Sequence, residues 1–191
     1  MLPDHESYLR AITQPTRLYI PSQVLGSIPS DVKKGVYAWW FRNIPPDVPV
    51  DGTVVADDRH LLYIGTGPVS PTSKSNLRER LRSHVSPDAS RSTLRKSLGC
   101  ILEFPFEITR KSKNNLHYGL GECEARLSQW LEKNARVSWA AHPSPWELES
   151  YLIKRLALPL NVDENGHCEF ACRLHERRKA LFAEARAKLG E

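Results

Sequence analysis

The segment GVYAWWF, residues 35–41, decides the fold. It is aromatic with a β-branched residue near its start, and such a run predicts a β-strand. A connection rich in proline and aspartate, residues 42–59, separates it from HLLYIG, residues 60–65. This second run also predicts a strand, and it ends on a glycine. Two strands close together in the chain therefore form the expected centre of a sheet.

Helices are expected around these strands. Asn76 is a good N-cap, and Glu79 lies three residues later, which predicts a helix that begins with a capping box. A short helix is expected from Ser92, a longer one over residues 122–133, a third strand from Arg136 and the last core helix within residues 146–161. The pattern predicts an α+β fold, with a small mixed sheet covered by helices.

The two ends of the chain are expected to lie outside this core. Residues 1–32 contain four prolines and are interpreted as a loosely packed N-terminal lead-in. Residues 164–191 predict a C-terminal helical extension, which leaves residues 33–163 as the central domain. Within that domain, residues 103–120 are expected to be irregular, and they include the basic patch from Arg110 to Lys113.

Composition limits the function classes. Of the 191 residues, 40% are hydrophobic and 26% are charged, as in a soluble globular protein. The net charge of +5 favours an anionic partner. The first residues lack the basic and apolar regions of a signal peptide, and no apolar run approaches the ~20 residues of a membrane span. We therefore expect a cytoplasmic protein that has no membrane partner and whose four cysteines are reduced thiols.

One carboxylate occupies an unexpected position. If residues 146–161 are helical, Glu149 lies at the centre of the apolar stripe formed by Leu152, Ile153 and Leu156. Glu147 falls on the opposite face, where a capping box with Ser144 would explain it. Burial of an unpaired carboxylate is costly, so Glu149 needs an arginine partner, a raised pKa or a metal ion. A buried salt bridge in the core and a functional site remain about equally good interpretations.

Four short motifs occur in a characteristic order: GVY at 35–37, YIG at 63–65, NLRERLRSH at 76–84 and ELESYLIKRLALPLN at 147–161. Together they resemble the GIY-YIG nuclease family, and the resemblance covers about residues 33–163. It implies a small antiparallel three-stranded sheet flanked by helices. It also implies a metal-dependent phosphodiesterase, with Glu149 as the metal ligand.

The resemblance carries six candidate catalytic residues onto this chain: Tyr37, Tyr63, Arg80, His84, Glu149 and Asn161. Adjacent antiparallel strands can bring the two tyrosine hydroxyls to one end of a sheet. Without the motif order, two strand tyrosines would be interpreted as packing residues. Likewise, an isolated asparagine after Pro159 would be interpreted as part of a turn.

Basic residues gather around the expected helix 76–84. Residues 74–113 hold ten Lys or Arg and four Asp or Glu, which predicts a phosphate-backbone surface with salt-sensitive binding. On that helix, Arg80 and His84 share one flank of the apolar stripe, while Arg78 and Arg82 lie on the other side. The nucleic-acid-binding candidates are Arg78, Arg82, Arg95 and Lys96; solvated surface charge is the alternative interpretation.

These residues suit hydrolysis of a phosphodiester bond. Arg80 can donate two hydrogen bonds to phosphate oxygens, and one carboxylate ligand suits Mg²⁺ (or Mn²⁺). Tyr37, its pKa lowered by nearby cations, is the first choice for general base. His84 is the competitor. Tyr63 and Asn161 are expected to orient water or phosphate. We expect an endonuclease that acts on DNA rather than RNA; the alternative is a non-catalytic nucleic-acid-binding module, and the oligomeric state stays open.

Overall fold

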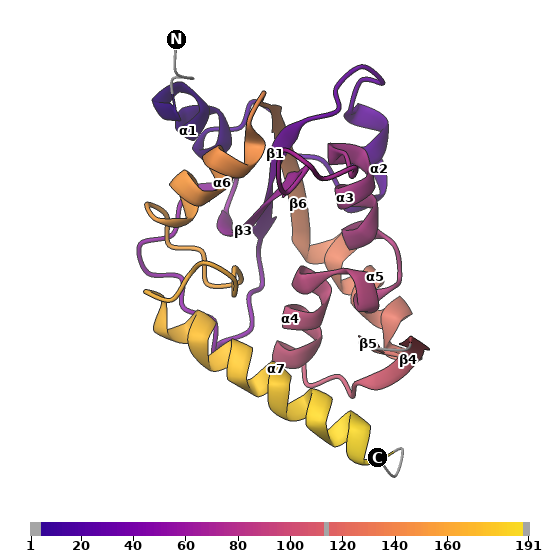
Figure 1. The fold of residues 1–191 in the computed structure, drawn as a ribbon. Coiled ribbons are helices and arrows are strands. Elements are labelled where there is room, and N and C mark those ends of the chain that lie inside the picture. Colours follow the sequence, from indigo (N-terminus) through magenta and orange to yellow (C-terminus); the bar gives the residue numbers. More distant parts are fainter. Residues whose placement is uncertain (1–4, 113–114, 189–191) are drawn as a thin grey trace.

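The computed structural model describes residues 5–112 and 115–188. Its helices and strands follow one another in the order shown in Figure 1: α1 (His5–Thr13), α2 (Pro21–Ser27), β1 (Gly35–Phe41), β2 (Val55–Ala56), β3 (Arg59–Gly67), α3 (Leu77–Val85), a 3₁₀ turn (Ala89–Arg91), α4 (Thr93–Ile101), β4 (Glu107–Ser112), β5 (Asn115–Gly119), α5 (Cys123–Asn134), β6 (Ala135–Ala141), α6 (Pro145–Ile153) and α7 (Glu169–Ala187). The α+β class predicted from the sequence is confirmed.

The central sheet is antiparallel throughout and has the strand order β2-β3-β1-β6. It therefore contains four strands instead of the expected three. The added strand, β2, is only two residues long and pairs with Arg59 and His60 at the beginning of β3. Because β2 is so short, most of β3 is left without a strand partner on that side.

Close packing explains the glycine of YIG. Tyr37 on β1 lies opposite Gly65 on β3. A Cβ atom at Gly65 would overlap the hydroxyl end of the Tyr37 side chain. Only glycine lets the strand pass so close to that ring, so Gly65 makes room for one of the two motif tyrosines.

Helices cover both faces of the sheet (Figure 1). One face carries α1 and α6, packed over Val36, Ala38 and Trp40. The other carries α2, α3 and α5, and its core includes Tyr37 and Trp39. The alternation along β1 follows from the two-residue period of a strand.

The N-terminal residues pack more tightly than the sequence suggested. Ile12 of α1 and Val24 of α2 are both fully buried. Both helices cover the sheet, and Tyr19 between them forms a bridge with Val137 on β6. The expectation of a loose lead-in over residues 1–32 is therefore wrong for its described part, because amphipathic helical turns between the prolines bury apolar side chains.

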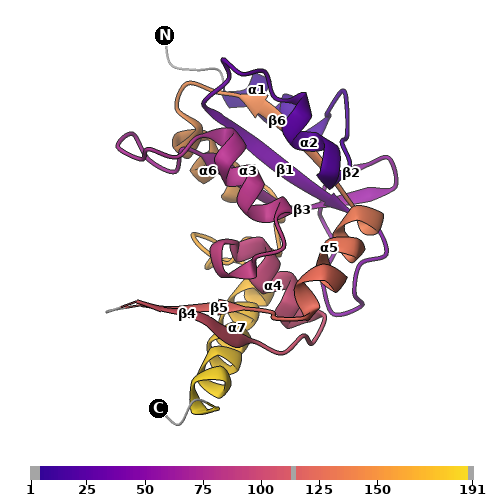
Figure 2. The same ribbon diagram turned by 90° about the vertical axis from the view of Figure 1, so that its right-hand side faces the viewer.

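A β-hairpin replaces the irregular segment expected at residues 103–120. Strands β4 and β5 pair in an antiparallel manner and lie beside α7 and the 3₁₀ turn (Figure 2). The error has a physical cause, since polar residues dominate both strands and hide their alternation. Lys113, at the end of the predicted basic patch, lies outside the described residues.

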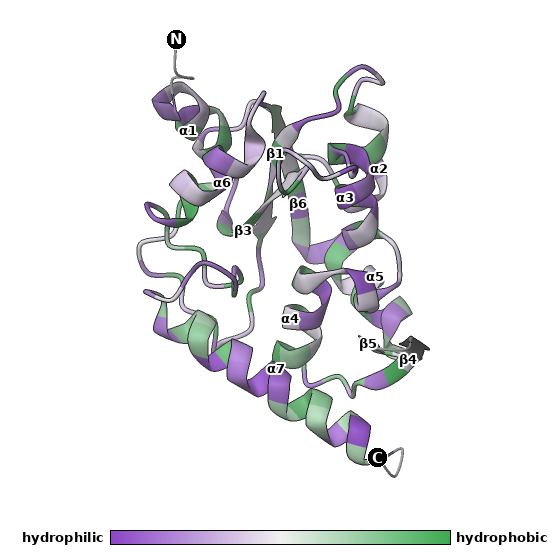
Figure 3. Cartoon of the chain, viewed as in Figure 1, coloured by the Kyte–Doolittle hydropathy of each residue, from purple (hydrophilic) through white to green (hydrophobic). Residues whose placement is uncertain are grey.

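The last helix, α7, packs against α4 and against β4. Hydrophilic and hydrophobic residues alternate along it (Figure 3), as expected for a helix with one buried side. Ala171 and Leu174 are buried, whereas Arg173 and Arg177 are exposed. In the described part of the chain, none of the helices is both long and apolar enough to cross a membrane.

Candidate active site

The open edge of β3 is closed by the segment that follows α6. Leu160 donates its backbone N–H to the carbonyl of Leu62 at 3.0 Å. The side chain of Asn161 then accepts from the N–H of Ile64 and donates to the carbonyl of Ile64, both at 2.9 Å. Asn161 thus imitates a neighbouring strand and holds the backbone between Tyr63 and Gly65 in place.

This arrangement assigns Asn161 a positioning role. Both ends of its amide are engaged by backbone groups, and the residue is 5% exposed. Asn161 also lines a hollow beside this edge, and its amide keeps a second N–H and a second oxygen lone pair, so the expectation that it orients water or phosphate stays a prediction.

A hollow of about 200 Å³ lies beside this edge. It brings together Tyr63 from β3, Arg80 from α3 and Glu149 from α6. These three elements approach from different directions, since α3 packs on one face of the sheet and α6 on the other. The rest of the lining is formed by Val69, Thr93, Ile153, Asn161, Val162, Asp163 and Glu164.

Glu149 lies in this hollow, where its ionised form is destabilised. Burial, followed by the neighbouring Glu164, raises the pKa of the Glu149 carboxyl to about 7, and the nearby Arg80 only partly opposes the shift. No described residue forms an ion pair with it. Glu147 is exposed, so the two glutamates do lie on opposite sides of α6. The capping box predicted for Glu147 is absent, since the Ser144 side chain makes no cap hydrogen bond.

A buried chain of polar groups lies behind Tyr63. The Tyr37 hydroxyl and His84 Nε2 are 2.6 Å apart, and His84 Nδ1 is 2.7 Å from Ser92 Oγ. Ser92 also caps α4 by accepting from the N–H of Arg95. The His84 ring meets the Tyr63 ring edge-on, with centroids 5.7 Å apart. These hydrogen bonds and the ring contact therefore fix the His84 side chain between Tyr37 and Tyr63.

Burial controls the protonation of His84 and Tyr37 in this chain of polar groups. It lowers the pKa of His84 to about 3, with smaller contributions from Arg80 and Arg95, so the imidazole is neutral near pH 7. Burial also raises the pKa of Tyr37 well above its usual value, and the nearby Arg80 does not reverse this. The lowered Tyr37 pKa expected from the sequence is thus wrong, because desolvation outweighs the cation.

The profile of the GIY-YIG catalytic domain family matches residues 35–180. The chain belongs to this family. The match spans both tyrosine motifs, Arg80, Glu149 and most of α7, so the hollow lies inside the nuclease catalytic domain. Comparisons with curated proteins and with solved structures give no match.

The GIY-YIG helix α3 begins as the sequence predicted. Asn76 accepts from the N–H of Glu79, and the Glu79 carboxylate accepts from the N–H of Asn76. This capping box fixes the first turn of the helix. One turn later, Arg80 reaches the hollow, and its buried Nε has no hydrogen-bond partner in the part of the chain that the structure describes. The guanidinium is therefore held at the site with bonding capacity to spare.

Two of the residues expected to contact nucleic acid have structural roles. Arg95 is fully buried and pairs with Glu124 at 2.6 Å, which ties α4 to α5. Arg78 donates to the carbonyls of Leu25 and Ile28 at the end of α2. The expectation that Arg95 binds nucleic acid is corrected, because sequence charge density does not distinguish buried from exposed arginines. Arg78 is half-buried, so its contact with nucleic acid stays a prediction beside this structural role.

The other two candidates stay available. Arg82 is exposed. Lys96 is half-buried and donates to the carbonyl of Ser90 at 2.8 Å; burial, followed by Arg178, lowers its pKa. A role for Arg82 or Lys96 in nucleic-acid binding remains a prediction.

The Arg78 contacts predict that removing this side chain lowers the stability of the fold. We expect Arg78→Ala to lower the free energy of unfolding by about 1.5–3 kcal/mol, the range for losing a hydrogen bond to a charged group. Urea denaturation measures this. The control Arg82→Ala, at an exposed site on the same helix, should change stability by less than about 0.5 kcal/mol. Equal stability of the two variants would contradict the assignment.

The raised pKa of Glu149 predicts that this residue costs stability. In the folded protein the carboxyl titrates at about 7, above its ordinary value of 4.5. The folded state thus holds a proton that the unfolded state loses, and stability falls as pH rises from about 4.5 to 7. In EDTA at pH 8, Glu149→Gln should gain about 3 kcal/mol, because each pH unit between the two pKa values is worth about 1.4 kcal/mol.

The same comparison at pH 5 is its control, since the carboxyl is then protonated in the folded state and pH 5 lies only slightly above its ordinary pKa of 4.5, so most of the gain should disappear. Urea unfolding at the two pH values measures the difference. A Glu149→Gln protein that is no more stable than wild type at pH 8 would show that the carboxylate is already compensated within the fold.

Sequence reasoning missed three charged residues around the site. Asp163 and Glu164 come two and three residues after Asn161 and line the hollow with Glu149. Arg178 comes from α7, and its buried Nε and Nη1 have no hydrogen-bond partners within residues 5–112 and 115–188. Its charge acts on Tyr63 and on Asp163. The adjacent acidic residues Asp163 and Glu164 could have been identified from the sequence as candidate site residues. Nothing in the local sequence around Arg178 indicates that it lies near the site.

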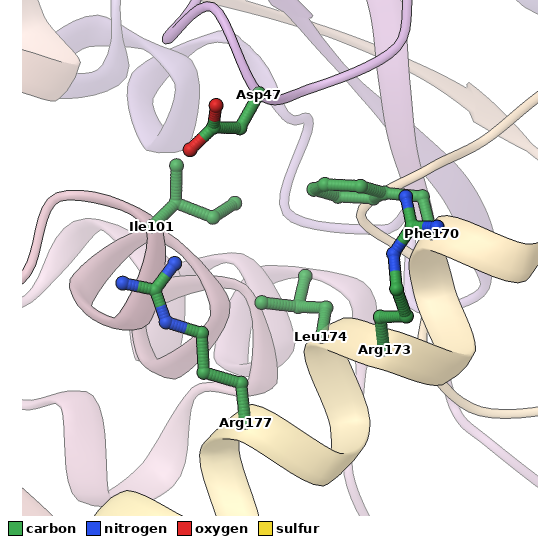
Figure 4. A pocket seen from close by; sticks show the side chains of 6 residues that line it. All are labelled: Asp47, Ile101, Phe170, Arg173, Leu174 and Arg177. Atoms are coloured by element: carbon green, nitrogen blue, oxygen red, sulfur yellow. The ribbon is translucent and has the colours of Figure 1, made fainter.

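A second hollow, of about 380 Å³, lies between α4, α7 and the loop containing Asp47 (Figure 4). Phe170, Arg173 and Arg177 project toward it from one side of α7. It shares no lining residue with the hollow around Glu149, and its arginines form ion pairs with Glu169 and Glu103. Its cations are therefore already balanced.

Proposed function

We propose that this GIY-YIG protein is a divalent-metal-dependent endonuclease that hydrolyses phosphodiester bonds in DNA. The observation that carries the proposal is the hollow beside β3. There, Glu149 and Arg80 line the same hollow; among the described residues, the carboxylate has no ion-pair partner and the guanidinium Nε has no hydrogen-bond partner. A phosphodiester and a hard cation together would satisfy both groups.

The chemistry of Glu149 fits a magnesium or manganese ion. A carboxylate oxygen is a hard ligand, and burial followed by Glu164 raises the pKa of the Glu149 carboxyl more than Arg80 lowers it, so a bound cation would stabilise the ionised form. In residues 5–112 and 115–188, no three His, Cys, Asp or Glu side chains come together as a metal site. Glu149 would thus be the protein ligand, with water and substrate completing the shell. When bound, the ion supplies Lewis-acid stabilisation of charge on phosphate oxygens.

The remaining residues divide into those that line the hollow and those that support it. Arg80 binds non-bridging phosphate oxygens in fork geometry and stabilises the charge that develops on them. Tyr63 is our candidate for holding the attacking water and accepting its proton, because it lines the hollow. Tyr37 is fully buried, so it supports Arg80 and Tyr63 from behind, with its hydroxyl held by His84.

A general-base role for His84 is the weaker proposal. The imidazole is 1% exposed and both of its nitrogens are engaged. With its pKa lowered to about 3 by burial, it is a poor proton acceptor at neutral pH. Its contacts suit the orientation of Tyr37.

DNA is the proposed substrate because the chain is basic around α3, although the alternative of a non-catalytic nucleic-acid-binding module shares that feature. The two are separated by incubating the purified protein with end-labelled single-stranded, duplex and branched DNA and matching RNA, with Mg²⁺ or with EDTA. The proposal expects internal cleavage of DNA in Mg²⁺ and none in EDTA. Binding without metal-dependent cleavage of any substrate would favour the binding module, and cleavage of RNA alone would overturn the choice of DNA.

A further inference from the structure

A third hollow, of about 540 Å³, lies along α3. Arg80 lines this hollow as well as the one around Glu149, so the two adjoin at its side chain. Arg82 and Arg91 provide two more guanidinium groups. The lining is completed by Ser75, Glu79, Ser83, Ser86 and Asp88.

The charged side chains that line this α3 hollow differ in whether they have partners within the protein. Its two carboxylates already accept backbone hydrogen bonds at helix starts: Glu79 from the N–H of Asn76, and Asp88 from the N–H of Ser90. By contrast, neither Arg82 nor Arg91 forms an ion pair with a described residue, and both are exposed. The site therefore offers free cationic donors beside the place where a phosphodiester would be cleaved.

This α3 hollow differs from the one against α7 in the state of its arginines. Arg173 and Arg177 are paired with glutamates, so a phosphate there would have to replace an existing partner. At Arg82 and Arg91 no such exchange is needed. Guanidinium groups recognise phosphate through paired N–H donors. Of the serines that line this hollow, Ser83 already donates to the Arg80 carbonyl at 2.7 Å and Ser75 is 2.9 Å from Ser73 Oγ, so the arginines carry the recognition.

We propose that the α3 hollow is a phosphate-binding subsite in which Arg82 and Arg91 hold the substrate strand on one side of the bond being cleaved, with Arg80 at the junction. The inference rests on the proposed function, and it assigns the path of the strand away from Glu149. It adds Arg91, which the sequence did not single out, and it gives the exposed Arg82 a specific ligand.

Binding of a labelled DNA duplex in EDTA tests the subsite apart from cleavage. The variant is Arg82→Gln/Arg91→Gln, and the matched control is Arg173→Gln/Arg177→Gln, which removes the same charge from α7. If two phosphate contacts are lost, the slope of log affinity against log salt should fall by about 1.8 for the first variant. It should change little for the control, whose arginines are balanced by glutamates.

Neutral methylphosphonate linkages, placed one at a time along the strand, locate the contacts. Wild-type affinity should drop at one or two positions next to the cleaved bond, and the Arg82→Gln/Arg91→Gln protein should lose that sensitivity. Equal effects in both double variants, or methylphosphonate sensitivity that survives the Arg82→Gln/Arg91→Gln change, would overturn the subsite. If only the subsite proposal is wrong, the wild-type protein still shows metal-dependent cleavage. If the proposed function is wrong, the wild-type protein shows no such cleavage.

Discussion

Glu149→Gln should abolish cleavage while the protein stays folded. The substitution keeps the size of the side chain and removes the charge that would hold a divalent ion in the hollow. Metal stabilisation of a phosphoryl transition state is worth several kcal/mol, so turnover should fall by at least about 10³-fold. Single-turnover cleavage at saturating Mg²⁺ measures the loss, and circular dichroism confirms the fold.

Glu147→Gln is the matched control, because it makes the same chemical change two residues away on the exposed side of α6. Its side chain forms no capping box, so it should retain near wild-type turnover. Comparable losses in the two folded variants would mean that charge on α6 matters in general, and that the Glu149 assignment is wrong.

Tyr63→Phe should cause the second large effect. The change removes only a hydroxyl, and a positioned group that accepts a proton contributes about 10²–10⁴-fold to a rate. Because Tyr63 lines the hollow and Tyr37 is fully buried, Tyr63→Phe should lose more turnover than Tyr37→Phe. Turnover is compared at saturating Mg²⁺ over a series of pH values.

The dependence of turnover on pH gives a second test of which residue accepts the proton. Burial, followed by the Glu149 charge, raises the pKa of Tyr63, so a rate that depends on its ionisation should climb into the alkaline range. His84, with its pKa lowered to about 3 by burial, cannot produce a rise between pH 6 and 7. If Tyr37→Phe proves more damaging than Tyr63→Phe, the original choice of Tyr37 as base is restored. A rise at pH 6–7 that His84→Ala removes would reinstate the histidine.

Local sequence signals located most of the core fold. An aromatic run identified β1, an apolar run that ends on a glycine identified β3, and the Asn76–Glu79 capping box located the start of α3. The hairpin β4–β5 was missed, since its polar strands carry little apolar alternation. The packing of α1 and α2 was also missed, because prolines near their ends obscured two short amphipathic helices.

The candidate site, too, could be predicted only in part from the sequence. Helical phase predicted that Glu149 and Glu147 point in opposite directions, and the motif order identified the chain as a GIY-YIG nuclease domain. Local sequence could not show that Arg95 pairs with Glu124, because that contact spans 29 residues. Nor could it reveal Arg178 on α7, whose charge acts on Tyr63 in the folded protein, where α7 packs on α4.

Binding of Mn²⁺, followed by the loss of its free-ion electron paramagnetic resonance signal, tests most directly whether Glu149 holds the metal of this site. The wild-type protein and Glu147→Gln should bind Mn²⁺ with equal affinity, and Mg²⁺ should displace it. Glu149→Gln should lose this binding. If the folded Glu149→Gln protein binds Mn²⁺ as tightly as the wild type, the ion lies elsewhere and the account of the active site is contradicted.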